Sequence, residues 1–92
     1  MKYLKAFPDY DSTLPQLDGF VDSSWRHDTC PSLLNETLGF QLWCEYADEN
    51  NRECGGKRFA LYHYDKDDGI LFLMESDSIE EIKQAIQAEV AA

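Results

Sequence analysis

The fold of this chain is decided by the stretch Thr37–Met74, which reads TLGFQLWCEYADENNRECGGKRFALYHYDKDDGILFLM. It contains three apolar runs, Leu38–Tyr46, Arg58–Tyr64 and Ile70–Met74, separated by polar loops that contain glycine. Alternate residues of the first run are apolar, as in a strand that buries one face of a sheet. The polar sequence Asp65–Gly69 suits a hairpin turn. We therefore predict an antiparallel β-meander of three to four strands.

The C-terminal segment has the period of an amphipathic helix. Isoleucine and valine recur there at spacings of three and four, at Ile79, Ile82, Ile86 and Val90. Ser78 with Glu81 fits a capping box, and Asp77 with Glu80 fits the same pattern one residue earlier. The spacing predicts a helix from about Ser78 to Ala91 whose apolar stripe packs on one face of the meander.

Residues 1–36 have no sustained period, because Pro8, Pro15 and Pro31 interrupt a segment rich in Asp and Ser. We expect an irregular arm that wraps around the sheet, although Tyr3, Lys5 and Phe7 alternate as in a short edge strand. Taken together, the pattern predicts a single α+β domain over residues 1–92. Its parts are the N-terminal arm (1–36), the meander (37–75) and one C-terminal helix (78–91).

The charge of the chain restricts its partners. Eight Lys and Arg residues against 18 Asp and Glu residues give a formal net charge of −10. Such a charge repels nucleic acids and anionic membrane surfaces, and it suits a basic protein. Solubility alone also accounts for an acidic surface. We predict no direct binding to nucleic acid or membrane, and a protein partner or self-association.

The location of the protein is predicted from its N-terminus and its cysteines. Residues 1–8 lack the long apolar centre of a signal peptide, and no apolar run approaches membrane-spanning length. The number of cysteines is odd (Cys30, Cys44 and Cys54), so a complete disulfide framework cannot form. These features predict a cytoplasmic protein with reduced thiols.

The sequence does not predict a metal or a cofactor. The possible ligands His27, Cys30, Cys44, Cys54 and His63 include no Cys-x-x-Cys pair, which a structural zinc site would favour. The acidic sequence that starts at Asp65 resembles the start of a calcium loop. An EF-hand needs glycine at its sixth position and glutamate at its twelfth, where this chain has Ile70 and Ser76. A hairpin turn explains this sequence better.

The segment Trp25–Ser32 allows two interpretations. In the first, the segment supplies a nucleophile and its base. The residue types would be Cys30 or Cys54 with His27 or His63, or Ser23 or Ser24 near His27 and Asp28. The chain has no Gly-x-Ser-x-Gly motif to position such a nucleophile. Alternatively the segment is a structural cap, in which Trp25 closes one end of the core, Asp28 accepts backbone hydrogen bonds and Pro31 fixes a turn. We predict no catalytic residue.

A second candidate site is an aromatic set on the predicted strands, composed of Trp43, Tyr62 and Tyr64 together with His63. Aromatic side chains on an exposed sheet face anchor ligands and partners, whereas the same residues are structural when the N-terminal arm covers them. Together with the preceding segment, this set supplies the candidate binding residues: Trp25, His27, Asp28, Trp43, Tyr62 and Tyr64.

Four short sequences together are similar to a pattern in small uncharacterised bacterial proteins of about this length. They are Trp25–Ser32, Leu42-Trp43-x-Glu45-Tyr46-Ala47-Asp48, Arg52-Glu53 and Lys57-Arg58-Phe59. The similarity covers most of residues 22–64 and implies a bacterial, cytosolic protein of one domain. It implies no activity and no binding residues.

Three functions follow as hypotheses. The first is a non-enzymatic module that binds a protein partner or a second copy through its acidic surface. The second is an acidic inhibitor, an immunity protein or nucleic-acid mimic, in which carboxylates replace phosphates; they would be Asp65, Asp67, Asp68, Glu75, Asp77, Glu80 and Glu81. The third is a small enzyme or metal protein centred on Trp25–Cys30, which requires His27, Asp28 and a cysteine to converge in one cleft.

Overall fold

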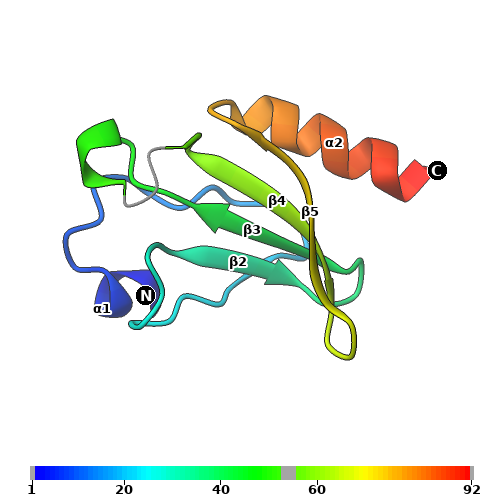
Figure 1. Ribbon diagram of the computed structural model, residues 1–92, viewed down its shortest axis with the longest axis horizontal. Coiled ribbons are helices and arrows are strands. Elements are labelled where there is room, and N and C mark those ends of the chain that lie inside the picture. Colours follow the sequence, from blue (N-terminus) through cyan, green and yellow to red (C-terminus); the bar gives the residue numbers. More distant parts are fainter. Residues whose placement is uncertain (1, 53–55, 92) are drawn as a thin grey trace.

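The protein is one antiparallel sheet with helices at its sides, shown as a computed structural model in Figure 1 and described over residues 2–52 and 56–91. Each of its five strands pairs with its neighbour in sequence, in the order β1-β2-β3-β4-β5. The elements are α1 (Lys2–Ala6), β1 (Val21–Asp22), β2 (Ser32–Asn35), β3 (Phe40–Cys44), the 3₁₀-helix η1 (Glu49–Asn51), β4 (Phe59–Asp65), β5 (Gly69–Ser76) and α2 (Ile79–Ala91). The predicted α+β class, meander and C-terminal helix are confirmed.

The sheet has more strands than predicted because the expected arm contributes two of them. β2 pairs with β3 from Ser32 opposite Trp43 to Asn35 opposite Phe40, and β1 pairs with β2. β2 has four residues and β1 has two, so neither is long enough to show a period in the sequence.

The expected edge strand through Tyr3, Lys5 and Phe7 is instead the helix α1. The Phe7 N–H donates to the Tyr3 carbonyl at 2.8 Å, and both aromatic side chains are buried while Lys5 is exposed. Residues four apart lie on one side of a strand and also on one side of a helix, so the pattern suits both structures.

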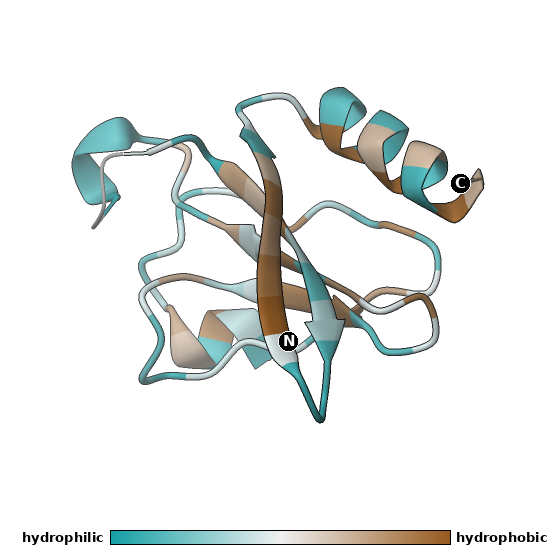
Figure 2. Ribbon diagram, turned by 45° about the vertical axis from the view of Figure 1, so that its right-hand side comes forward, coloured by the Kyte–Doolittle hydropathy of each residue, from teal (hydrophilic) through white to brown (hydrophobic). Residues whose placement is uncertain are grey.

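The hydrophobic core lies on one side of the sheet, which we call the inner face. Strands β2 to β5 place alternate side chains there, with Leu42 and Leu61 paired at its centre and fully buried. Ile82 of α2 packs against them, and the N-terminal arm adds Tyr3, Phe7, Tyr10 and Leu14 to the same cluster. Figure 2 shows that α2 turns its apolar side toward the sheet. Val90, predicted to lie on the buried stripe, is 55% exposed.

The start of α2 is capped by a small network of hydrogen bonds. The Ser78 hydroxyl accepts from the Glu81 N–H at 3.4 Å, as the capping box predicts. The Glu81 carboxylate accepts from the Ser76 hydroxyl at 3.0 Å, and that hydroxyl oxygen accepts from the Ser78 N–H at 3.0 Å. The last residue of β5 is therefore tied to the first turn of α2.

The β4–β5 connection is the predicted hairpin turn. The Asp65 carboxylate accepts from the backbone N–H groups of Asp67 and Asp68 at 2.8 and 3.2 Å. Gly69 follows with φ of +86°, a conformation in which a side chain would be strained. The Asp65 carboxylate therefore stabilises a hairpin turn, which is the interpretation that the sequence favoured over a calcium loop.

The packing of α2 on the inner face is tested by Ile82→Ala. Removing a fully buried isoleucine should lower the free energy of unfolding by about 2–5 kcal/mol, through lost burial and the cavity left behind. Val90→Ala, on the same helix but exposed, should change it by less than about 0.5 kcal/mol. Urea unfolding followed by circular dichroism measures both values. Equal effects of the two substitutions would contradict this packing.

Candidate functional site

The other side of the sheet, the outer face, carries an open cleft of about 490 Å³. Trp43, Ala60 and Tyr62 form its floor, since Trp43 lies opposite Ala60 in the β3–β4 pair and the side chains of Ala60 and Tyr62 share a face. The remaining lining residues come from the loop before β2, from the β3–β4 connection and from β5: His27, Asp28, Thr29, Cys30, Glu45, Gly56, Lys57, Ile70 and Glu75.

Serine hydroxyls hold the segment before β2, which forms one wall, against the sheet. The Ser24 hydroxyl accepts from the Ser32 N–H at 3.2 Å, and the Ser23 and Ser32 hydroxyls are hydrogen-bonded at 2.9 Å. Asp22 accepts from the Ser24 N–H at 3.0 Å and from the Tyr3 N–H at 2.7 Å. The two serines proposed as nucleophiles are therefore used to anchor this wall.

The opposite wall belongs to β5. Ile70 lies opposite Tyr64 and Phe72 lies opposite Tyr62, so both side chains point to the outer face; they are 50% and 51% exposed. Phe72 meets the Tyr62 ring edge-on, with 5.5 Å between the ring centroids. Figure 2 shows β5 as an apolar ribbon along the front of the molecule. The strand thus presents apolar side chains next to the aromatic floor of the cleft.

Arg52 holds the third border of the cleft. Its guanidinium is almost completely buried and donates to the backbone carbonyls of Tyr46, Ala47 and Gly56 at 2.7, 3.1 and 3.0 Å. Asp77, just after β5, accepts from Arg52 at 3.4 Å. Arg52 therefore connects the described residues on both sides of this connection, 46–47 and 56, and links them to the residue that follows β5.

The cleft is both aromatic and acidic. Its lining contains three carboxylates, those of Asp28, Glu45 and Glu75. It also contains the ammonium group of Lys57. The Lys57 ammonium lies 3.5 Å from the Asp77 carboxylate, which already balances its charge. A cation that enters this cleft would meet carboxylates and aromatic faces together, a combination that favours Lys and Arg side chains.

Four of the six predicted binding residues converge on the cleft: His27, Asp28, Trp43 and Tyr62. The other two do not line it. Trp25 contacts the ring of His27, with 5.6 Å between centroids, and Tyr64 lies further along β4 in the hollow beside Leu38 and Gly39.

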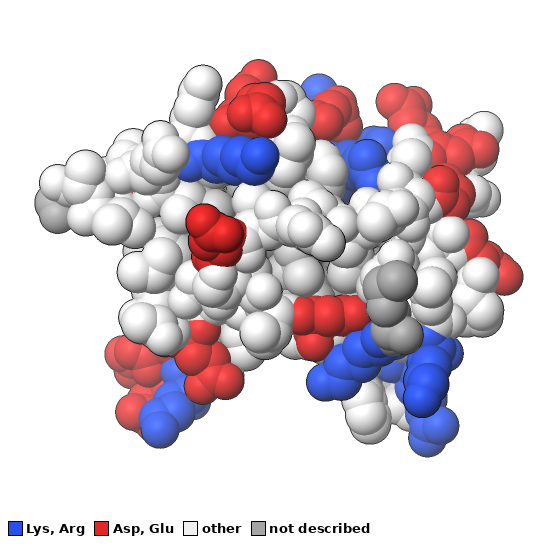
Figure 3. All heavy atoms as spheres, turned by 180° about the vertical axis from the view of Figure 1, so that it is seen from behind, with Lys and Arg blue, Asp and Glu red and all other residues white. Residues whose placement is uncertain are grey.

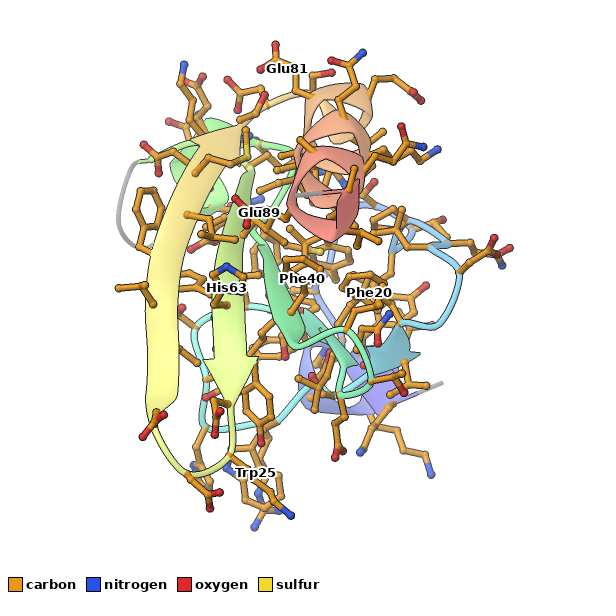
Figure 4. The ribbon with its side chains drawn as sticks, turned by 90° about the vertical axis from the view of Figure 1, so that its right-hand side faces the viewer. Phe20, Trp25, Phe40, His63, Glu81 and Glu89 are labelled. Atoms are coloured by element: carbon orange, nitrogen blue, oxygen red, sulfur yellow. The ribbon has the colours of Figure 1, made fainter. Side chains whose placement is uncertain are left out.

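Trp25 does not close the core as the cap interpretation expected. Its side chain is 57% exposed, and Figure 4 places it on the side of the molecule away from α2. The first part of the N-terminal arm joins the inner-face cluster, whereas residues 27–30 of the same arm line the cleft beside Trp43 and Tyr62, which are partly buried. Sequence reasoning did not name Ile70 and Phe72 of β5 as binding residues, because an apolar run does not by itself show that its strand lies at the edge of the sheet.

His63, grouped with the aromatic set in the sequence, lies on the inner face instead. Its ring stacks on Phe40 at 5.4 Å, and its Nε2 lies 3.3 Å from the Glu89 carboxylate of α2. Figure 4 shows His63 and Glu89 facing each other between β4 and α2. This histidine therefore links the helix to the sheet and is separate from the cleft.

The described thiols, Cys30 at the cleft and Cys44 in the inner-face core, are poor nucleophiles. Burial raises the pKa of Cys30 to about 12, and burial also raises the pKa of Cys44, so both remain protonated near neutral pH. Within residues 2–52 and 56–91 no three His, Cys, Asp or Glu side chains are grouped as metal ligands. Cys54, named above as a possible metal ligand and as a possible nucleophile, lies outside the described residues. The requirement that His27, Asp28 and a cysteine share one cleft is met by Cys30, but burial raises the pKa of this thiol and so lowers its reactivity.

The carboxylates proposed to imitate phosphates are divided between two places. Asp65, Asp67 and Asp68 lie at the hairpin, whereas Asp77, Glu80 and Glu81 follow the other end of β5. The eight residues of β5 separate the groups by about 23 Å. On the side seen in Figure 3, acidic groups also lie in several places with Lys and Arg among them.

Comparisons with family models, with curated proteins and with solved structures find no match for this chain. The similarity of residues 22–64 to small bacterial proteins therefore stays a prediction. Among the helices of the described residues, none has the length and apolar character needed to cross a membrane.

The raised pKa values predict that Cys30 and Cys44 resist alkylation. In a Cys54→Ser variant, iodoacetamide at about pH 8 should leave both thiols unmodified while the chain is folded, because less than about one thiol in a thousand is ionised at that pH. Mass spectrometry measures the modification, and the same reaction in urea provides the control. Rapid alkylation of Cys30 in the folded protein would restore the covalent hypothesis.

The border of the cleft should weaken in acid. The Arg58 N–H, which donates to Asp77 at 2.9 Å, and the nearby Lys57 and Arg52 lower the pKa of this carboxyl below 3.8. The resulting stabilisation is present above that pH and is lost as the pH falls through the lower folded-state pKa.

Asp77→Asn tests this dependence. The variant should unfold at lower urea concentration than the wild type at about pH 7, and the difference should shrink as the pH falls toward about 2. Urea midpoints measured over this range give the comparison. A difference that stays constant down to the acid end would show that the charge of Asp77 contributes nothing.

Proposed function

We propose that this protein is a non-enzymatic protein-binding module, and that its binding surface is the outer-face cleft together with the adjoining side chains of β5. The observation that carries this proposal is the pair Ile70 and Phe72, both half exposed beside an aromatic cleft. Large apolar side chains grouped at the surface mark interaction sites in monomeric proteins.

The energetics of this surface suit a partner. Burying the exposed halves of Ile70 and Phe72 would contribute about 1 kcal/mol each, from the usual value for burying such side chains completely. Trp43 and Tyr62 are partly buried and already fixed by their strands, so they lose little conformational freedom on binding. Such rigid aromatic residues are the common anchors of protein interfaces.

The charge of the protein supports a basic partner. The net charge of −10 and the three carboxylates of the cleft attract Lys and Arg side chains over a distance of about 10 Å at ordinary salt. The same charge repels phosphates, so the proposal excludes direct binding to nucleic acid and to anionic membranes.

We infer a cytoplasmic location for the module. Cys30 and Cys44 are both free thiols within the described chain, as in proteins of reducing compartments. An inhibitor that imitates a nucleic acid is a weaker proposal, because the carboxylates assigned to it are separated by the length of β5.

The proposal is tested by capturing partners from native lysate on immobilised protein. Phe72→Ser should reduce the capture of specific partners by at least about tenfold relative to wild type, because it removes an exposed apolar anchor. Leu4→Ser is the matched control, since Leu4 is also exposed but lies on α1. Quantitative mass spectrometry at low and high salt measures the capture.

Circular dichroism first establishes that both variants fold. Retention of the same proteins by wild type and Phe72→Ser would contradict the proposed surface. Failure of the wild type to retain any protein at low salt would contradict the proposed function as a whole.

A further inference from the structure

The outer edge of β5 is open. In the part of the chain that the structure describes, β5 pairs with β4 and ends the sheet. It is eight residues long, and its consecutive residues Ile70, Leu71 and Phe72 are 50%, 66% and 51% exposed. Proteins commonly protect such edges with Pro, Lys or short strands, because an open edge accepts another strand. The sequence GILFLMES of β5 contains neither Pro nor Lys, and its β-bulge, where the register shifts between the Leu61–Met74 and Tyr62–Phe72 pairs, follows the exposed residues 70–72.

We propose that β5 receives an extended polypeptide segment as a sixth strand of the sheet, and that this segment has an apolar centre with Lys or Arg at both ends. The inference rests on the proposed function, because it assigns the chemistry of the partner that the same surface binds. Backbone hydrogen bonds to the edge supply affinity in this mode of recognition, and side chains on alternating faces supply specificity.

The apolar centre follows from the two faces of β5. Ile70 and Phe72 point to the outer face, whereas Leu71, opposite the inner-face residue His63, points the other way. A strand added beside them would therefore meet apolar side chains on both sides of the sheet. Apolar residues at consecutive positions of the segment would cover Ile70, Leu71 and Phe72 together.

The Lys or Arg residues at both ends of the partner segment are inferred from the charges at the two ends of the exposed apolar run of β5. The hairpin carries three acidic residues, Asp65, Asp67 and Asp68, and one basic residue, Lys66. All four are exposed. Beyond Phe72 the outer face leads to Glu75 and the cleft, which Asp28 and Glu45 also line. Each end is thus acidic, so a segment that lies along β5 gains from a cationic residue near each end.

A second copy of this chain fits the same edge less well. Two β5 strands that pair antiparallel about a two-fold axis would bring the hairpin of each copy toward the Glu75 end of the other, so that carboxylates meet carboxylates. Each copy also carries a net charge of −10. The charge therefore favours a basic segment from another protein.

Short peptides provide the test. The probe is a fluorescent eight-residue peptide with a Val-Ile-Val-Ile centre and Lys-Arg at each end, and its control has Glu in place of every Lys and Arg. We expect the basic peptide to bind the full chain at least about tenfold more tightly than the acidic one at low salt, and to weaken as salt rises. Fluorescence anisotropy measures the affinities.

Methylation of peptide nitrogens separates strand addition from recognition of side chains alone. Two further basic peptides are N-methylated at alternate residues, one at odd and one at even positions. Only one set of N–H groups faces β5, so one methylated peptide should lose binding while the other keeps it. Asp67→Lys should weaken binding of the basic peptide several-fold, and Asp18→Lys, an equal charge change on the arm, should weaken it less.

Three outcomes would overturn the inference. Equal binding by both methylated peptides would show that the backbone edge is not used. Absence of peptide binding, when Phe72→Ser still loses its lysate partners, would leave the proposed function standing and remove strand addition. Sedimentation that shows a dimer of wild type, disrupted by Phe72→Ser, would assign the edge to a second copy.

Discussion

Burial on a single face of the sheet is the constraint on which the rest of this structure depends. Ile82 of α2 packs against the central pair Leu42 and Leu61, and all three are fully buried. The N-terminal arm adds Tyr3 and its aromatic neighbours to the same cluster. Because α2 and the first part of the arm pack on the inner face, the outer face is lined by the later part of the arm, the short loop before β2. The cleft and the exposed side of β5 are consequences of this division.

The chemistry of the outer face is determined by the residues that line its cleft. Its floor is aromatic, its borders are carboxylates, and Arg52 and Asp77 hold the connection that closes one end. The Cys30 thiol, which lines this face, is buried, and burial raises its pKa. An aromatic and acidic surface beside an open apolar edge is suited to recognition of a basic polypeptide, where contact and charge act together.

Much of the fold could be predicted from periodicity alone. Alternation identified β3, apolar runs between polar loops identified β4 and β5, the spacing of the isoleucines identified α2, and Asp65 and Gly69 identified the hairpin. β1 and β2 are too short to show a period, and the pattern of the first residues suits a strand and a helix equally. Val90 was predicted to lie on the buried stripe, but it is 55% exposed, although Glu89 beside it still contacts His63 of β4.

The sequence by itself determined the α+β class, the acidic charge and the residue types near Trp25 and Trp43, because composition and local spacing are properties of the chain. Only the tertiary structure decided that His27, Asp28, Trp43 and Tyr62 share one cleft while Trp25, Tyr64 and His63 lie outside its lining. It also decided that β5 is the edge strand, so that Ile70, Leu71 and Phe72 of its apolar run are at least half exposed. The physical reason is that strand order and the face chosen by α2 depend on contacts between residues far apart in the sequence.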